Sequence, residues 1–137
     1  MKIVRLGKDV KMPVKSHLPD CGLDIFIPQD IIIDSLQTKT VGLGLKVAIP
    51  EGFAGMLVPR SSIAEKGLII QTSIIDPDYT GEIHLIITNC STNLREIHAG
   101  DRVCSLVVYS VLNAYLEEVE ELPKTERGNR GLGSSGR

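Results

Sequence analysis

The sequence predicts an all-β domain, built as a sandwich, a jelly roll or a barrel, with one short helical turn and a flexible C-terminal arm. Short apolar runs recur along the chain, and Gly, Pro, Asp and Asn separate them. Turn signals such as PEG at 50–52 and DYTG at 78–81 interrupt these runs. Many short strands with frequent turns are typical of these all-β architectures.

Each expected strand is a short run of β-branched or other apolar residues. The segment 38–50, TKTVGLGLKVAIP, is interrupted by glycines, which predicts a strand with a bulge or a close backbone approach. The expected strands cover residues 2–6, 23–27, 30–33, 39–49, 54–58, 68–71, 82–88, 95–98, 103–110 and 114–120.

The stretch SSIAEKG at 61–67 predicts a single helical turn. Ser62 followed by Glu65 has the spacing of a capping box, and Gly67 suits a left-handed exit from the helix. We expect the first-turn amides, beside Arg60 and the serine hydroxyls, to form an anion-binding turn.

The chain changes character after Pro123. Residues 1–123 are expected to form one β-rich core, whereas 124–137, KTERGNRGLGSSGR, are rich in Gly, Ser and Arg and poor in apolar residues. This composition is typical of a disordered tail. It also suits a flexible arm that becomes ordered over a phosphate, because Gly permits close approach while Ser and Arg donate hydrogen bonds. Both interpretations are open from composition.

Composition and charge exclude several classes of protein. The chain has 137 residues, which suits one domain, and its net charge of −2 gives no basic excess for nucleic acid or an acidic membrane. We therefore expect neither as a partner. Three widely spaced cysteines form no zinc motif and no disulfide framework. With no long apolar run, the expected location is cytoplasmic, or the host cytosol or nucleus for a viral protein.

The stretch IIDPDYTGEIHLIITN at 74–89 holds the strongest candidate for chemistry. Asp76 follows an apolar run and precedes Pro77, which stiffens the turn, so its carboxylate is a candidate general base at the edge of an apolar pocket. Alternatively, Asp76 merely initiates a turn, Tyr79 is a half-buried strand end, and Asp24 in PDCGLDIFIP is a surface acid. Together with Arg60 and the Gly-rich tail, these groups suit a polyphosphate ligand and in-line attack by water.

Five stretches in order resemble the motifs of the homotrimeric dUTPase family. They are DCGLDI at 20–25, PRSSIAEKGL at 59–68, SIIDPDYTGEI at 73–83, GDRVCSLVV at 100–108 and RGNRGLGSSG at 127–136. The resemblance implies the distorted jelly-roll fold of that family. It also implies hydrolysis of dUTP to dUMP and pyrophosphate.

The resemblance further implies a role for each matched residue. Asp76 would activate the water that attacks the α-phosphorus, and Tyr79 would pack under the sugar and exclude a 2′-hydroxyl. Asp24 would support Mg²⁺ indirectly, through water. The other implied substrate-binding residues are Arg60, Ser61, Ser62, Gln71, Thr72, Ser73, Ile75, Ser105, Arg127, Gly131, Leu132, Gly133, Ser134 and Ser135.

The resemblance also implies a homotrimer with active sites shared between subunits and an arm donated to a neighbour. Some positions depart from the family pattern. Leu132 stands where the arm usually has an aromatic residue, and Ser105 where Gln is usual. Ser73 stands where Asn or Gly is frequent, so a positive φ there would be harder to adopt.

Two other functions remain open at this point. A dCTP deaminase shares the fold, but its chemistry needs a carboxylate two residues beyond His84, where this chain has Ile86. A binding or regulatory protein is the alternative from another class, because some phage members of the family are thought to act as protein-binding switches.

Overall fold

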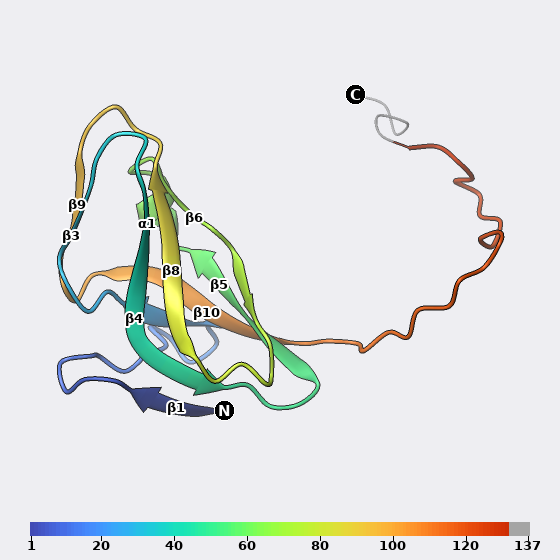
Figure 1. Cartoon of the computed structure of the whole chain (residues 1–137), viewed down its shortest axis with the longest axis horizontal. Coiled ribbons are helices and arrows are strands. Elements are labelled where there is room, and N and C mark those ends of the chain that lie inside the picture. Colours follow the sequence, from blue (N-terminus) through green and yellow to red (C-terminus); the bar gives the residue numbers. More distant parts are fainter. Residues whose placement is uncertain (132–137) are drawn as a thin grey trace.

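The structure is a computed structural model that describes residues 1–131. Its body consists of two four-stranded sheets and a two-stranded ribbon, in the orders β1-β4-β8-β6, β2-β10-β5-β7 and β3-β9 (Figure 1). The elements are β1 (Lys2–Arg5), β2 (Gly22–Phe26), β3 (Ile31–Ile33), β4 (Thr38–Ala48), β5 (Phe53–Pro59), α1 (Ser61–Ala64), β6 (Leu68–Ile70), β7 (Ser73–Ile75), β8 (Glu82–Asn89), β9 (Arg95–Ile97) and β10 (Arg102–Ser110). The all-β, jelly-roll-like prediction is confirmed.

Alternation of apolar and polar residues in the long strands builds the core. In β8, Ile83, Leu85 and Ile87 are buried while His84 and Ile86 face outward. This is the period of two that a strand with one buried face requires. Strands of both sheets contribute to one apolar cluster, whose fully buried members include Ile25, Leu43, Leu45, Leu57, Leu85, Ile87 and Leu106. The side chains on the outward face of β8 do not take part in this core.

The predicted irregularity in β4 is present. Its pairing with β8 shifts register between Gly42 and Lys46, and Gly44 adopts φ 67°. The Gly44 N–H donates to a carboxylate oxygen of Glu82 at 2.9 Å, which replaces the interrupted ladder bond. A side chain at Gly44 would place its Cβ only 2.6 Å from Val10. The glycine is therefore required for both its backbone conformation and its close contact.

The predicted helical turn forms, but the predicted capping box is wrong. α1 begins at Ser61, so its N-cap is Arg60, and no side chain caps it. Ser62 therefore lies inside the first turn rather than at the cap. Gly67 takes φ 75°, as expected for the exit. Nothing helical among residues 1–131 has the length and apolar character needed to cross a bilayer.

The predicted strand at 114–120 is wrong. β10 ends at Ser110, Val111 makes a last backbone bond to Gly52, and the chain then runs away from the body (Figure 1). Tyr115 and Leu116 are fully exposed. β-propensity expresses packing against neighbouring strands, and no strand of the body lies beside this segment. By contrast, β7 formed at Ser73–Ile75, where no strand was predicted.

We predict that Gly44→Ala destabilises the fold by about 2–4 kcal/mol, because it combines an unfavourable φ with overpacking against Val10. Gly52→Ala is the matched control, since Gly52 has φ 81° with open space around its Cβ position. That change should cost only about 1 kcal/mol. Urea unfolding of both variants measures the difference, and equal losses would contradict the close-contact explanation.

Candidate functional site

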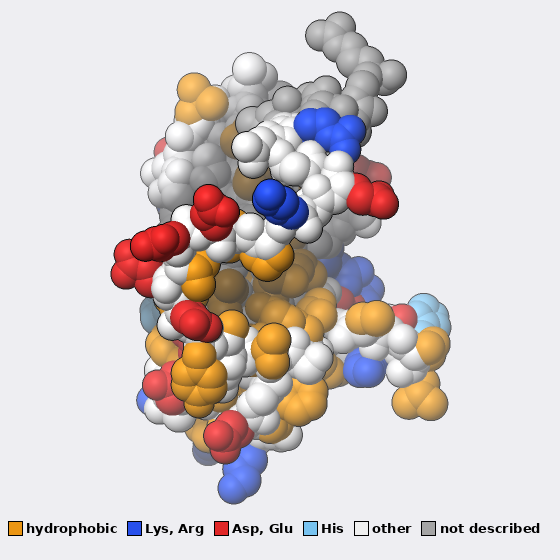
Figure 2. All heavy atoms as spheres, turned by 90° about the vertical axis from the view of Figure 1, so that its right-hand side faces the viewer, with side chains coloured by type: hydrophobic (Ala, Val, Ile, Leu, Met, Phe, Trp, Pro, Cys, Tyr) orange, Lys and Arg blue, Asp and Glu red, His pale blue; other side chains and the backbone are white. Residues whose placement is uncertain are grey.

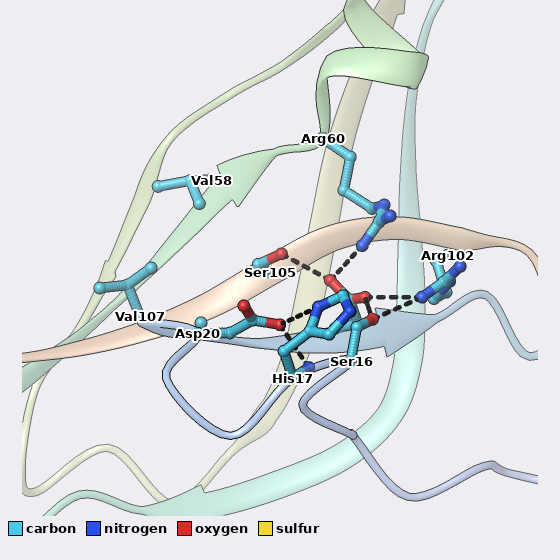
Figure 3. Close-up of a pocket in the computed structure, with 10 residues that line it drawn as sticks. Ser16, His17, Asp20, Val58, Arg60, Arg102, Ser105 and Val107 are labelled. Atoms are coloured by element: carbon cyan, nitrogen blue, oxygen red, sulfur yellow. Dashed lines mark hydrogen bonds and ion pairs between the residues drawn. The ribbon is translucent and has the colours of Figure 1, made fainter.

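A polar hollow opens at one end of the β2-β10-β5-β7 sheet, where the expected anion-binding residues gather (Figure 3). Asp24 projects from β2, Ser105 from the adjacent β10, and Arg60 follows the end of β5. The register explains the grouping, because Asp24 lies directly opposite Ser105. The residues that line the hollow are Ser16, His17, Asp20, Gly22, Asp24, Val58, Arg60, Arg102, Ser105 and Val107.

The Asp24 carboxylate organises the hollow. One oxygen accepts from the Ser105 hydroxyl at 2.9 Å and pairs with the Arg60 guanidinium. The other oxygen accepts from the Ser16 hydroxyl and from Arg102, each at 3.1 Å. Asp24 is 6% exposed, so these partners compensate a charge that is largely removed from water. Two guanidinium groups thus flank one carboxylate, and these three groups together carry a net positive charge.

The protonation of Asp24 follows from the same contacts. Burial raises the pKa of its carboxyl, but hydrogen bonds from Arg60, Ser105 and Ser16, with the charge of Arg60, outweigh burial and leave the pKa below 3.8. Asp24 is therefore ionised at neutral pH. Each of its oxygens already accepts from two donors, which fills the lone-pair positions of a carboxylate. A metal-bound water could donate to Asp24 only if Ser16 or Ser105 gave up its bond.

Cys104 lies beside this cluster and takes no part in its chemistry. Burial and the charge of Asp24 raise the pKa of its thiol to about 12. The thiol therefore stays protonated and unreactive.

The predicted base occupies a different place. Asp76 is exposed at the end of β7, and its carbonyl accepts from the Tyr79 N–H at 3.1 Å. The Tyr79 hydroxyl donates to the Glu82 carbonyl at 2.6 Å, which fixes the ring against its own turn. The apolar setting expected for Asp76 is limited to its buried neighbour Ile75. The carboxylate itself faces solvent.

Register shows how far apart the two carboxylates are. Ser105 of β10 pairs with Asp24 of β2 on one side and with Val58 of β5 on the other. Gly55 of β5, three residues before Val58, pairs with Ile75 of β7. This offset is about 10 Å along the strands, and the three strand spacings from β2 to β7 add about 14 Å across the sheet. Asp24 and Asp76 of one chain are therefore roughly 17 Å or more apart. One chain does not bring its predicted base to its own arginines.

The remaining predicted residues fall into three groups. Ser61 and Ser62 lie in α1 directly after Arg60, and Ser62 lines a second small pocket with Arg60 and Arg102. Gln71 and Thr72 form the exposed link between β6 and β7, and Ser73 lies in β7 without a positive φ, so the expected strain does not arise.

The third group belongs to the C-terminal arm. Arg127 and Gly131 lie in the segment that extends away from the body (Figure 1). Leu132, Gly133, Ser134 and Ser135 lie outside the described residues. The placement of the arm at a site therefore stays a prediction.

Sequence reasoning missed Ser16, His17, Asp20 and Arg102 as lining residues. Arg102 carried a signal, since it stands in GDRVCSLVV, shortly before Ser105 on the same strand. Ser16 reaches Asp24 through the backbone bridge between Val14 and Asp24, which local sequence does not reveal.

Comparison with known proteins identifies the family. The sequence model of the dUTPase family matches residues 8–136. The chain belongs to the dUTPase family. A deoxyuridine 5′-triphosphate nucleotidohydrolase of Corynebacterium glutamicum is 39% identical over 141 residues, covering 100% of this chain and 95% of that protein. A Rattus norvegicus relative of the same name is 33% identical, over 100% of this chain and 67% of its own length.

Solved dUTPase structures share the fold. The dUTPase of Staphylococcus bacteriophage 80alpha, solved with dUpNHpp, superposes with a TM-score of 0.94 at 28% identity, covering 99% of this chain and 98% of that one. A mutant dUTPase of S. aureus phage phi11, described with a structural Mg(II) ion, has a TM-score of 0.85 at 25% identity, covering 90% of this chain and 98% of that one. As a dUTPase, the chain hydrolyses dUTP to dUMP and pyrophosphate.

We predict that Asp24→Asn lowers the free energy of unfolding by about 3 kcal/mol at pH 7, because it leaves two guanidinium groups without their carboxylate. Since the pKa of Asp24 is lowered on folding, its stabilisation is complete above pH 3.8 and is lost as pH falls through the lower folded value. The difference between wild type and variant should therefore shrink below about pH 4.

Thermal unfolding from pH 7 to pH 3 measures this difference. Asp34→Asn is the control, because Asp34 is exposed and far from the arginines in the sequence. A wild-type advantage that persists unchanged at pH 3 would contradict the account.

Proposed function

We propose that this dUTPase holds the phosphate chain of dUTP at the Arg60–Asp24–Arg102 cluster. The observation that supports this most strongly is the buried Asp24 carboxylate between two guanidinium groups. Asp24 accepts from only some of the N–H groups of each guanidinium. The remaining N–H groups of Arg60 and Arg102 would therefore be available to phosphate oxygens. The Ser61 and Ser62 hydroxyls at the start of α1 would add neutral donors.

Asp76 is proposed as the general base. Its carboxylate would accept a proton from water as the water oxygen bonds to the α-phosphorus. The bond from that phosphorus to the bridging oxygen then breaks, and pyrophosphate leaves with the bonding electrons. Pro77 fixes the turn after Asp76, so the water would be held in line with little reorganisation.

Tyr79 is proposed to select deoxyribose. Its ring is held by the hydrogen bond from its hydroxyl to the Glu82 carbonyl, so it cannot readily swing aside for a 2′-hydroxyl. A side chain that is held in place excludes an added hydroxyl group better than one that can move. The uracil base would then be contacted from β7 and the link before it, by Gln71, Thr72, Ser73 and Ile75.

Mg²⁺ is proposed to accompany the triphosphate. Among the described residues, no cluster of His, Cys, Asp and Glu could hold a metal, and the Asp24 lone pairs are taken. This donor set fits a metal bound mostly by phosphate oxygens and water, as Mg²⁺ often is. When bound, Mg²⁺ supplies charge neutralisation of the phosphates.

A homotrimer with shared sites is proposed because one chain is incomplete. Asp76 is too far from its own arginines to serve a phosphorus held there, since a general base must approach the attacking water to about 3 Å. A closed symmetric assembly would bring Asp76 of one subunit to the cluster of another.

The surface is consistent with such an assembly. Leu112, Tyr115 and Leu116 are at least 90% exposed in the segment that leaves the body. Hydrophobic side chains also gather on the face of the body turned toward that segment (Figure 2). These surfaces would be buried between subunits, and the segment would carry the arm, with Arg127 and Gly131, to a neighbouring site. We further propose a reducing compartment, such as the cytoplasm, since the three cysteines are unpaired.

We predict that wild type releases pyrophosphate from dUTP and that Asp76→Asn lowers kcat by at least about 10²-fold, because the base is removed. Asp78→Asn is the matched control on the same turn and should retain most activity. A coupled pyrophosphate assay measures all three. Equal kcat for wild type and Asp76→Asn would reject Asp76 as the base, and an inactive wild type would favour the regulatory alternative.

We predict that removal of residues 124–137 leaves a folded trimer with kcat/KM lowered by about 10²-fold or more, because arm donors no longer close over the phosphates. Sedimentation checks the assembly and the pyrophosphate assay checks turnover. Unchanged kcat/KM in the truncated protein would show that the arm plays no part.

A further inference from the structure

One wall of the polar hollow is formed by the loop before β2, which contains none of the residues predicted to bind substrate. In this loop, residues 17–20 form a tight turn: the His17 N–H donates to an Asp20 carboxylate oxygen at 2.8 Å, and the Asp20 N–H donates to the His17 carbonyl at 3.1 Å. The imidazole Nδ1 lies 3.7 Å from the same carboxylate oxygen. The turn thereby holds the His17 ring at the hollow, beside Ser16 and the Asp24 cluster (Figure 3).

Most other hydrogen-bond donors in the hollow already donate to groups of the protein. The hydroxyls of Ser16 and Ser105 both donate to Asp24. Val58 and Val107 offer only apolar surface. Apart from the free edges of the two guanidinium groups, the imidazole of His17 is the side chain on this wall that can donate to an anion. Its side chain is 80% exposed, so a ligand can reach it without rearrangement.

We propose that His17 is a phosphate-binding residue of this dUTPase, donating from its imidazole to the polyphosphate held by Arg60 and Arg102. This inference rests on the proposed phosphate position. It assigns the loop before β2 a direct contact with the substrate. Asp20 would orient the ring from the opposite nitrogen, as carboxylates commonly orient histidines.

Charged groups surround this contact. Asp20 faces one ring nitrogen, and Asp24, Arg60 and Arg102 line the same hollow. The ring nitrogen that faces away from Asp20 is the one that would donate to phosphate, and a single N–H there is enough for the bond.

The test compares His17→Ala and His17→Gln with a matched control, His98→Ala. His98 stands in the same kind of turn: its N–H donates to Asp101 at 3.0 Å, and its ring lies 3.9 Å from Asp30. It is 69% exposed and is not among the residues that line the hollow. A general effect of removing an exposed, carboxylate-paired histidine would therefore appear in both alanine variants.

The probes are inorganic pyrophosphate, deoxyuridine and dUTP itself, with the full-length protein. We expect His17→Ala to weaken pyrophosphate binding by about three- to tenfold and to raise KM for dUTP with kcat nearly unchanged. Deoxyuridine, which has no phosphate, should bind all variants alike. His17→Gln should recover part of the loss, since its amide still donates.

Three outcomes would overturn the inference: pyrophosphate binding equal in His17→Ala and wild type, an equal loss in His98→Ala, or a parallel loss of deoxyuridine affinity. Failure of the underlying phosphate position is distinguishable, because wild type would then bind pyrophosphate no better than Arg60→Ala or Arg102→Ala does.

Discussion

The ion-pair network around Asp24 is the constraint on which the site depends. A carboxylate at the sheet end is nearly removed from water, so the fold must supply donors from several directions. It recruits Arg60 from the end of β5, Arg102 from the start of β10, and Ser16 from the loop before β2. Segments that are distant in sequence are thereby fixed around one point. The same contacts that stabilise the charge also orient two guanidinium groups for an anion.

In the proposed mechanism, this arrangement separates anion binding from the acid–base chemistry. β10 and β5 lie between the strand of Asp24 and the strand that precedes Asp76. The turn that carries Asp76 is stiffened by Pro77 and by the Tyr79 hydroxyl, yet it faces solvent. Each half is thus well ordered by local contacts but chemically incomplete. The proposed oligomer would join the arginines of one subunit to Asp76 of another without altering the core, and exposed apolar surface would favour its formation.

Local sequence predicts local structure well in this chain. The alternation in β8 and the glycines of β4 indicated the right elements, because burial periodicity and positive φ are properties of a few neighbouring residues. The family resemblance led to Asp24 and Arg60, but not to their grouping with Ser16 and Arg102. That grouping depends on which strands pair, a long-range property.

The errors have different origins. The capping box failed because α1 begins two residues earlier than its pattern suggested, with Arg60 rather than Ser62 as the cap. The strand at 114–120 failed because β-propensity needs a neighbouring strand, and within one chain this segment has none beside it. Ser73 caused no strain, because β7 keeps it in an extended conformation. The cap and Ser73 are thus errors of local detail, whereas the strand at 114–120 failed for lack of a distant partner.

Subunit complementation tests the shared site most directly. Arg60→Ala and Asp76→Asn chains, each nearly inactive alone and each confirmed to be folded, are unfolded together and refolded at equal amounts. If each site takes its arginine and its base from different chains, random assembly places intact partners together in about a quarter of sites. The mixture should then recover about a quarter of wild-type pyrophosphate release. A mixture as inactive as its two parents would contradict a site built from more than one chain.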